Sequence, residues 1–173
     1  MIRSVLTTSL LIFMHTSFAA ETLPPARLQK DTNIIGSVEA LGLPQPGIVL
    51  DARVDTGAEL SSLDARNLRS FQKIHHKKKE WVSFDLVDRK TGRCQHMEVP
   101  VERYVKIKRH GVDSQCRPVV CMPAIMGSRK QNILFTLADR RQFQYPVLIG
   151  RNYLASGQLV DISQAYLAGQ PVL

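Results

Sequence analysis

The clearest alternation of side-chain character in the chain lies at residues 81–87. Its even positions are the apolar residues Val82, Phe84 and Leu86, and the positions beside them are of mixed polarity. A period of two is typical of a strand with one buried face. Residues 88–92, Asp-Arg-Lys-Thr-Gly, have the composition of a hairpin turn, and residues 97–107 return with further apolar positions. This part of the chain therefore predicts a β-hairpin.

Most of the chain beyond residue 32 follows the same pattern of short apolar runs bounded by turn residues. We expect strands at residues 33–41, 48–54, 117–122, 131–137, 144–149 and 159–166, with a turn at 43–47. One short helix is expected at 150–155, ending at Gly157, and 60–71 fits either a short helix or an irregular segment. The pattern predicts an all-β fold, a small closed or nearly closed β-barrel with one short C-terminal helix.

A candidate catalytic motif, Asp55-Thr56-Gly57-Ala58, directly follows the expected strand 48–54, which places a carboxylate on a tight turn. Residues 147–152, Val-Leu-Ile-Gly-Arg-Asn, are of the apolar-apolar-Gly type that packs beneath such a turn. An isolated Asp-Thr-Gly arises by chance on the order of once in ten chains of this size. The two segments in this order are far more specific, and together they indicate half of an aspartic-peptidase active site.

The chain carries one Asp-Thr-Gly turn, whereas the chemistry of aspartic peptidases needs two. About 150 residues remain after an N-terminal leader, which is enough for one domain with a core and too few for a second catalytic lobe. An aspartic peptidase built from this chain must therefore be a homodimer, with one Asp55 from each copy meeting across a two-fold axis. A peptide or protein would be its substrate.

The N-terminus has the features of an export signal. Met1-Ile2-Arg3 gives a positive start, residues 5–14 are mostly apolar, and Ser17-Phe18-Ala19 offers small residues where a signal peptidase cleaves. We expect a signal peptide at residues 1–19, a leader or tether at 20–32, and the folded domain at 33–173. The localisation predicted is periplasmic. A retained membrane anchor is the alternative, but the apolar stretch is shorter than the ~18 to 20 residues that span a bilayer.

Basic residues outnumber acidic ones, 23 Lys+Arg against 15 Asp+Glu, for a net charge of +8. The densest run lies at residues 73–79, where the lysines are Lys73, Lys77, Lys78 and Lys79. Such a run most often forms a solvated loop, and the alternative is contact with an anionic surface or acidic peptide. We expect no nucleic-acid partner, because no aromatic residues are interleaved with the lysines.

Three cysteines, Cys94, Cys116 and Cys121, leave one unpaired in an oxidising compartment. If residues 117–122 form a strand, the Cα atoms of Cys116 and Cys121 lie ~16 Å apart, too far for a disulfide. Any disulfide would then join Cys94 to one of them. A zinc site of these cysteines with His96 is the alternative, but no established zinc-ligand spacing supports it. We therefore expect no metal and no cofactor.

With these motifs in order, the chain resembles a known family. The matching segments are 33–36, 44–47, 52–58 with 61–65, 81–84, 117–120 and 145–151, and the similarity runs over about residues 33–168. They resemble the bacterial retropepsin-like aspartic peptidases of the RimB-like type, long labelled "ATP-dependent zinc protease". The resemblance implies a retropepsin-like closed β-barrel, a catalytic Asp55 and dimerisation. Relatives often lie near ATP-grasp peptide ligases, which hints at substrates that carry added amino acids.

This sequence departs from the family at two positions. The family usually has a basic residue after Asp-Thr-Gly-Ala and a histidine near position 64, whereas this chain has Glu59 and Asp64. Substrate preference should therefore not be transferred. Neither a phosphate-binding Gly-x4-Gly-Lys motif nor a metalloprotease His-Glu-x-x-His motif occurs in the chain, so the words ATP and zinc in the label find no support.

Physical chemistry suggests a role for each residue of the motif. Two Asp55 carboxylates forced together share one proton, so one can accept a proton from water while the other donates to the peptide carbonyl. Thr56 would hydrogen-bond the partner's turn, and Gly57 would permit the turn conformation and the approach of the substrate. Ser61 could bond the Asp55 carboxylate or cap the turn. The remaining support would come from Ala58, Ile149, Gly150 and Arg151.

The hairpin from Trp81 to Val105 is the candidate flap over the substrate, and the alternative is a plain barrel hairpin. Two other functions stay open beside the exported aspartic endopeptidase. One is a non-catalytic β-barrel that binds an envelope peptide, and the other is a zinc-dependent hydrolase.

Overall fold

The fold is a small closed β-barrel, described here from a computed structural model that covers residues 33–73, 79–109 and 112–173. Six strands form the ring, each hydrogen-bonded to the next, and a pairing between the first and the last closes it. In order around the ring they are β2 (Val38–Leu43), β3 (Ile48–Val54), β10 (Val147–Ile149), β4 (Ser61–Asp64), β9 (Arg129–Ala138) and β8 (Val112–Met126). The all-β barrel expected from the sequence is confirmed.

The barrel core is filled by the apolar positions of the alternating strands. In β3, Ile48, Leu50, Ala52 and Val54 are buried, while the residues between them are partly or fully exposed. β9 contributes Phe135 and Leu137 in the same way. Successive side chains of a strand point to opposite faces, so each strand needs an apolar residue only at every second position to fill the core.

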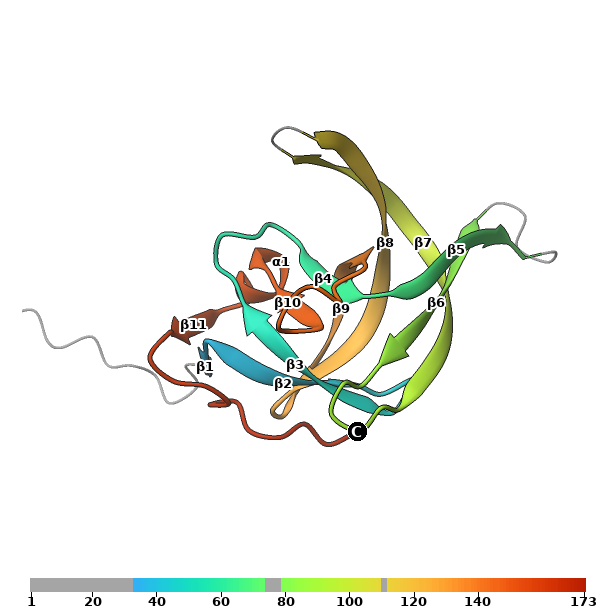
Figure 1. Cartoon of the computed structure of the whole chain (residues 1–173). Coiled ribbons are helices and arrows are strands. Elements are labelled where there is room, and N and C mark those ends of the chain that lie inside the picture. The colour runs from blue at the N-terminus through green and yellow to red at the C-terminus, as the bar shows by residue number, and fades with distance from the viewer. Residues whose placement is uncertain (1–32, 74–78, 110–111) are drawn as a thin grey trace, which may run out of the picture. The chain divides into compact units, whose positions relative to one another are not determined.

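Three further strands continue the sheet outward from β8. They are β7 (Cys94–Arg109), β6 (Glu80–Val87) and β5 (Arg66–Gln72), all antiparallel to their neighbours. The first half of β7 pairs with β6 and the second half with β8, so one long strand belongs to two hairpins. Figure 1 shows the far part of the β7–β8 hairpin reaching beyond the barrel.

Several expected elements are confirmed, and others have different limits. The hairpin of residues 81–87 and 97–107 is present as β6 and β7, and the short helix as α1 (Arg151–Leu154). The expected first strand is divided into β1 (Asn33–Gly36) and β2. β1 pairs in parallel with β11 (Gln158–Asp161), which ends earlier than expected.

The expectation for residues 60–71 was wrong, because this segment forms two strands, β4 and β5. All four residues of β4 are buried, two of them serines, so the strand has no polar alternation. β5 is polar and mostly exposed, and it is an edge strand whose one strand partner among the described residues is β6. Neither pattern predicts a strand from sequence alone.

The chain beyond β11 folds back onto the barrel and is held by a buried carboxylate. Glu39 of β2 is fully buried and accepts hydrogen bonds from the backbone N–H groups of Gly36, Leu167 and Ala168, at 2.5 to 3.3 Å. Gly127, at φ +58°, lies against the Ala168 carbonyl, where a Cβ atom would come within 2.3 Å of its oxygen. The C-terminal segment is therefore packed against the barrel, with Glu39 as its main polar attachment.

The three cysteines are free and exposed, so Cys94 forms no disulfide with Cys116 or Cys121. Cys116 lies opposite Lys106, twelve residues along β7 from Cys94, which is about 40 Å of extended strand. Cys121 follows Val120, the partner of Val101, and lies roughly 20 Å along the strand from Cys94. Within the described residues no three His, Cys, Asp or Glu side chains are grouped as metal ligands would be.

Two lysines of the basic run have carboxylate partners on β7. Lys73 Nζ lies 3.0 Å from Glu98 and over the Trp81 ring, and Lys79 Nζ lies 3.0 Å from Glu102. Lys77 and Lys78 lie outside the described residues, as do the expected signal peptide and leader at 1–32. In the described part of the chain, no helix has the length and apolar character to cross a membrane.

Candidate active site

Asp55 lies on a tight turn at the end of β3. Its backbone N–H donates to the Ile149 carbonyl at 2.9 Å, which continues the pairing of β3 with β10. Its Oδ1 atom accepts from the N–H groups of Gly57, at 2.9 Å, and Ala58, at 3.3 Å. Oδ2 accepts no hydrogen bond from the described part of the chain. The main chain thus orients one carboxylate oxygen and leaves the other available.

β10 and the start of α1 lie directly beneath this turn. Ile149 is fully buried opposite Val54, and a Cβ atom on Gly150 would lie 2.7 Å from the backbone of Leu60. Glycine is therefore required at position 150 by the close approach of two backbone segments. The structure brings together the two motifs that stand almost a hundred residues apart in the sequence.

Arg151 contacts the turn from the helix side. Its N–H donates to the Ala58 carbonyl at 2.8 Å, and its guanidinium donates to the carbonyls of Gly57, at 2.8 Å, and Thr56, at 3.3 Å. These bonds satisfy the carbonyl groups of three successive residues after Asp55. Ile149, Gly150 and Arg151 therefore all contact the Asp55 turn.

Ser61 does not bond the Asp55 carboxylate, contrary to one of the two expectations for it. Its hydroxyl donates to Asn152 Oδ1 at 2.8 Å and accepts from the Gly150 N–H at 3.0 Å. Asn152 also accepts from the Ser61 N–H at 2.8 Å and donates to the Leu134 carbonyl at 2.9 Å. Ser61 and Asn152 thus join β4, β9 and α1 under the turn.

Asn152 is the supporting residue that sequence reasoning missed, although it stands in the quoted motif. The available signal was a polar side chain at the second position of a helix, directly after Gly150 and Arg151. Its backbone N–H also donates to the Glu59 carbonyl at 3.1 Å. One asparagine therefore holds both ends of the segment between the turn and β4.

Thr56 and Gly57 are both exposed. Within the part of the chain that the structure describes, the Thr56 hydroxyl has no hydrogen-bond partner. Gly57 has no left-handed φ angle, so the turn conformation does not require glycine at this position, contrary to expectation. A Cβ atom at this position would lie 3.2 Å from Asp55 Oδ1, so glycine instead leaves room beside the carboxylate.

A pocket of about 510 Å³ begins three residues after Asp55. On one side it is bounded by the segment after the turn, and on the other by the far part of the β7–β8 hairpin. Its lining consists of Ala58, Glu59, Leu60, Ser62, Arg103, Val105, Lys106, Ile107, Arg117, Thr136, Arg140 and Leu148.

The hairpin beside this pocket is β7–β8 rather than the expected one from Trp81 to Val105. Only the last residues of that segment, Arg103 and Val105, reach the pocket. The β6–β7 turn is attached to the barrel instead, through Lys90 to Asp51 at 2.8 Å and through Arg93 to the Gly47 carbonyl at 2.8 Å. The length of β7 is the reason, because its second half pairs with β8 past the end of β6.

The pocket is basic. Its cations are Arg103, Lys106, Arg117 and Arg140, and Glu59 is the one carboxylate among its lining residues. Cations that line a pocket raise the local concentration of anions.

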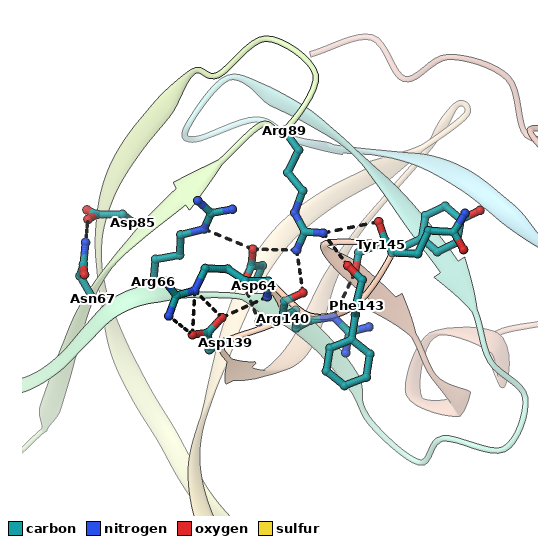
Figure 2. Close-up of polar contacts among 11 residues, drawn as sticks. Asp64, Arg66, Asn67, Asp85, Arg89, Asp139, Arg140, Phe143 and Tyr145 are labelled. Carbon is teal, nitrogen blue, oxygen red and sulfur yellow. Dashed lines mark hydrogen bonds and ion pairs between the residues drawn. The ribbon is translucent and has the colours of Figure 1, made fainter.

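Asp64, one of the departures from the family pattern, fixes the buried end of this region. It is 1% exposed, it accepts from the Arg140 N–H at 2.7 Å and from Arg89 at 3.0 Å, and it forms an ion pair with Arg66 at 3.5 Å (Figure 2). Arg89 also donates to the Arg140 carbonyl at 2.8 Å. Asp64 therefore holds the loop after β9 to the barrel.

A second, mostly apolar pocket of about 430 Å³ lies on the other side of the turn. Thr56 and Arg151 form one wall, and Leu154, Ala155 and residues 158–160 form the rest. Leu159 is 50% exposed there, and Ile34, whose neighbour in the register is Leu159, is 44% exposed. Apolar side chains are thus left uncovered next to the Asp55 turn.

A closed six-stranded barrel that carries Asp-Thr-Gly on a turn above a Leu-Ile-Gly strand defines a protein of the retropepsin-like class. A family model described as the retropepsin-like aspartic endopeptidase RimB matches residues 34–171, and the chain belongs to this RimB-like family. The resemblance drawn from the sequence is confirmed.

Individual relatives add a second name. A probable alpha-L-glutamate ligase from Desulfotalea psychrophila is 35% identical over 134 residues, which are 74% of this chain and 28% of the relative. Another from Shewanella pealeana is 32% identical, over 79% of this chain and 30% of the relative. The chain thus spans less than a third of the length of these curated relatives.

Among solved structures, a protein of unknown function from Legionella pneumophila is similar, with a TM-score of 0.68 and 29% sequence identity. The match covers 79% of this chain and 98% of that one. The matched part of this chain therefore corresponds to nearly all of that solved chain.

Proposed function

We propose that the protein is an aspartic endopeptidase that hydrolyses peptide bonds with water activated by a pair of Asp55 carboxylates. The observation that supports this most is the Asp55 turn, where backbone N–H groups hold Oδ1 and leave Oδ2 available beside a pocket. Two such carboxylates in contact hold one proton between them. One then accepts the proton of the attacking water while the other donates to the peptide carbonyl.

The catalytic form that we propose is a homodimer, because one chain supplies one Asp55 turn. The Thr56 hydroxyl, which has no partner among the described residues, and the apolar pocket beside it support a second copy at this face. Leu159 and Ile34 would be covered in such a dimer, which would remove exposed apolar surface. The two turns would then lie next to each other across the two-fold axis.

Acidic peptides are the substrate class that we propose. Four cations line the pocket next to the turn, against one carboxylate. The curated relatives are named for glutamate, an amino acid with an acidic side chain.

Export is proposed from the sequence of residues 1–19, and intact-mass measurement of the periplasmic fraction tests it. A mass that retains Met1 to Ala19 would contradict cleavage after Ala19.

The test of the peptidase proposal is Asp55→Asn. The amide keeps the shape of the carboxyl group and can still accept from the Gly57 N–H, but it can neither take a proton from water nor share one. We expect kcat to fall at least ~10²- to 10⁴-fold with little change in thermal stability. Cleavage of an acidic peptide library by wild type and variant is compared by mass spectrometry, with and without EDTA. Equal cleavage by both proteins, abolished by EDTA, would refute the aspartic mechanism.

A further inference from the structure

Three neighbouring strands form the floor of the basic pocket. Ser62 of β4 lies opposite Leu148 of β10 on one side and Thr136 of β9 on the other. Side chains at paired positions project from the same face of a sheet. All three residues line the pocket, so Ser62 is at the centre of its floor.

The Ser62 hydroxyl is buried and has no hydrogen-bond partner in the described part of the chain. The residue is 6% exposed. Two nearby hydroxyl groups do have partners. The Ser61 hydroxyl donates to Asn152, and the Thr136 hydroxyl donates to the Ser61 carbonyl at 3.1 Å. Buried hydroxyl groups nearly always have a partner, so this exception indicates a partner that comes from outside the chain.

Arg140 is a second buried residue that lines this pocket and has unused hydrogen-bond donors. It is 6% exposed, its Nε donates to the Tyr145 carbonyl at 3.2 Å, and its guanidinium lies over the Phe143 ring at 4.6 Å (Figure 2). Its two terminal nitrogens have no hydrogen-bond partner among the described residues. Burial lowers the pKa of Arg140, the Asp64 carboxylate raises it, and the nearby Arg89 and Arg117 lower it further, for a net decrease. A buried guanidinium in such surroundings is stabilised by an anion.

The structure assigns Ser62 and Arg140 to a carboxylate-binding subsite that determines the specificity of the proposed peptidase. A guanidinium offers two parallel N–H donors, which match the two oxygens of a carboxylate, and the serine hydroxyl adds a third donor. The pocket volume of about 510 Å³ accommodates an acidic side chain or the end of a peptide. The carboxylate belongs either to a glutamate side chain or to a free peptide C-terminus. This assignment rests on the proposed function, because it makes the pocket a part of the substrate site.

The experiment uses matched peptides that differ only in Glu or Gln at one position, with amidated C-termini. A second pair carries neutral side chains and ends in either a free carboxylate or an amide. The measured quantity is the ratio of kcat/KM between the charged and the neutral member of a pair. For wild type we expect a ratio of at least ~10 in one of the two pairs, which identifies the source of the carboxylate.

Ser62→Ala should lower this ratio about 3- to 10-fold, and Arg140→Lys, which keeps the charge but loses the fork, should lower it about 10-fold. The matched control is Ser128→Ala, an exposed serine in the β8–β9 turn, which should leave the ratio unchanged. Ratios in Ser62→Ala and Arg140→Lys that equal the wild-type ratio would overturn the assignment.

The same comparison is made by binding, so that it does not depend on catalysis. Asp55→Asn protein is titrated with the same peptides, and the ratio of Kd values is measured with and without Ser62→Ala. A wild type that cleaves no peptide but shows the carboxylate preference in binding would contradict the peptidase proposal and support the subsite. Cleavage without a preference for either carboxylate would support the peptidase proposal and contradict the subsite.

Discussion

Ser61 and Ser62 are neighbouring buried serines whose replacement by alanine should affect stability very differently. Ser61 is fully buried, and its hydroxyl is the acceptor for the buried N–H of Gly150. Ser61→Ala leaves this N–H without an acceptor, while Asn152 Oδ1 keeps its bond from the Ser61 N–H. An orphaned buried donor costs about 1–3 kcal/mol. For a domain of this size the Tm should fall roughly 3–10 °C.

Ser62→Ala is the matched control for stability, because it removes a buried hydroxyl that has no partner. We expect a free energy of unfolding within about 0.5 kcal/mol of wild type, or slightly higher. Both variants are measured by urea denaturation at one fixed protein concentration, since a dimer's stability depends on concentration. Because Gly150 lies beneath the Asp55 turn, Ser61→Ala should also lower kcat.

If Ser61→Ala and Ser62→Ala unfold at the same urea concentration, the bond from Gly150 to Ser61 contributes nothing. If Ser62→Ala is the more destabilised variant, the Ser62 hydroxyl has a partner within the protein, and the subsite assignment fails with it.

Three further outcomes follow from individual contacts. Gly150→Ala should cost about 1–3 kcal/mol of stability, because its Cβ would lie 2.7 Å from the Leu60 backbone; unchanged denaturation would show that the segment can move. Leu159→Asp should raise the dimer dissociation constant at least ~10-fold in sedimentation experiments, and an unchanged constant would place the interface elsewhere. Hydrogen bonds from Arg141 lower the pKa of Asp139 from 3.8 to about 2. The ionised Asp139 therefore contributes fully to the free energy of unfolding above about pH 4, and this contribution is lost as the pH falls toward 2. Asp139→Asn should remove a small part of the stability difference between pH 5 and pH 2, and identical acid titrations of the two proteins would contradict this.

The features that the sequence alone determined are local ones. The alternation around Val82, Phe84 and Leu86 predicted β6 because a strand with one buried face needs a period of two. The Asp55 turn and the segment 147–151 were recognisable because each depends on a few consecutive residues with a special backbone or packing need. The fold class and the family followed from the order of these local signals.

The tertiary structure decided whatever depends on neighbours that are distant in the sequence. β4 is a strand because β9 and β10 pair on both sides of it, and this burial suppresses the alternation that would have revealed it. Ser61 bonds Asn152, 91 residues away, rather than Asp55, because helix α1 brings that amide beneath the turn. The hairpin β7–β8 bounds one side of the pocket because β7 is long enough to extend past β6 and pair again with β8. Side-chain partners and the choice between two hairpins depend on long-range pairing, which a local pattern of polar and apolar residues does not specify.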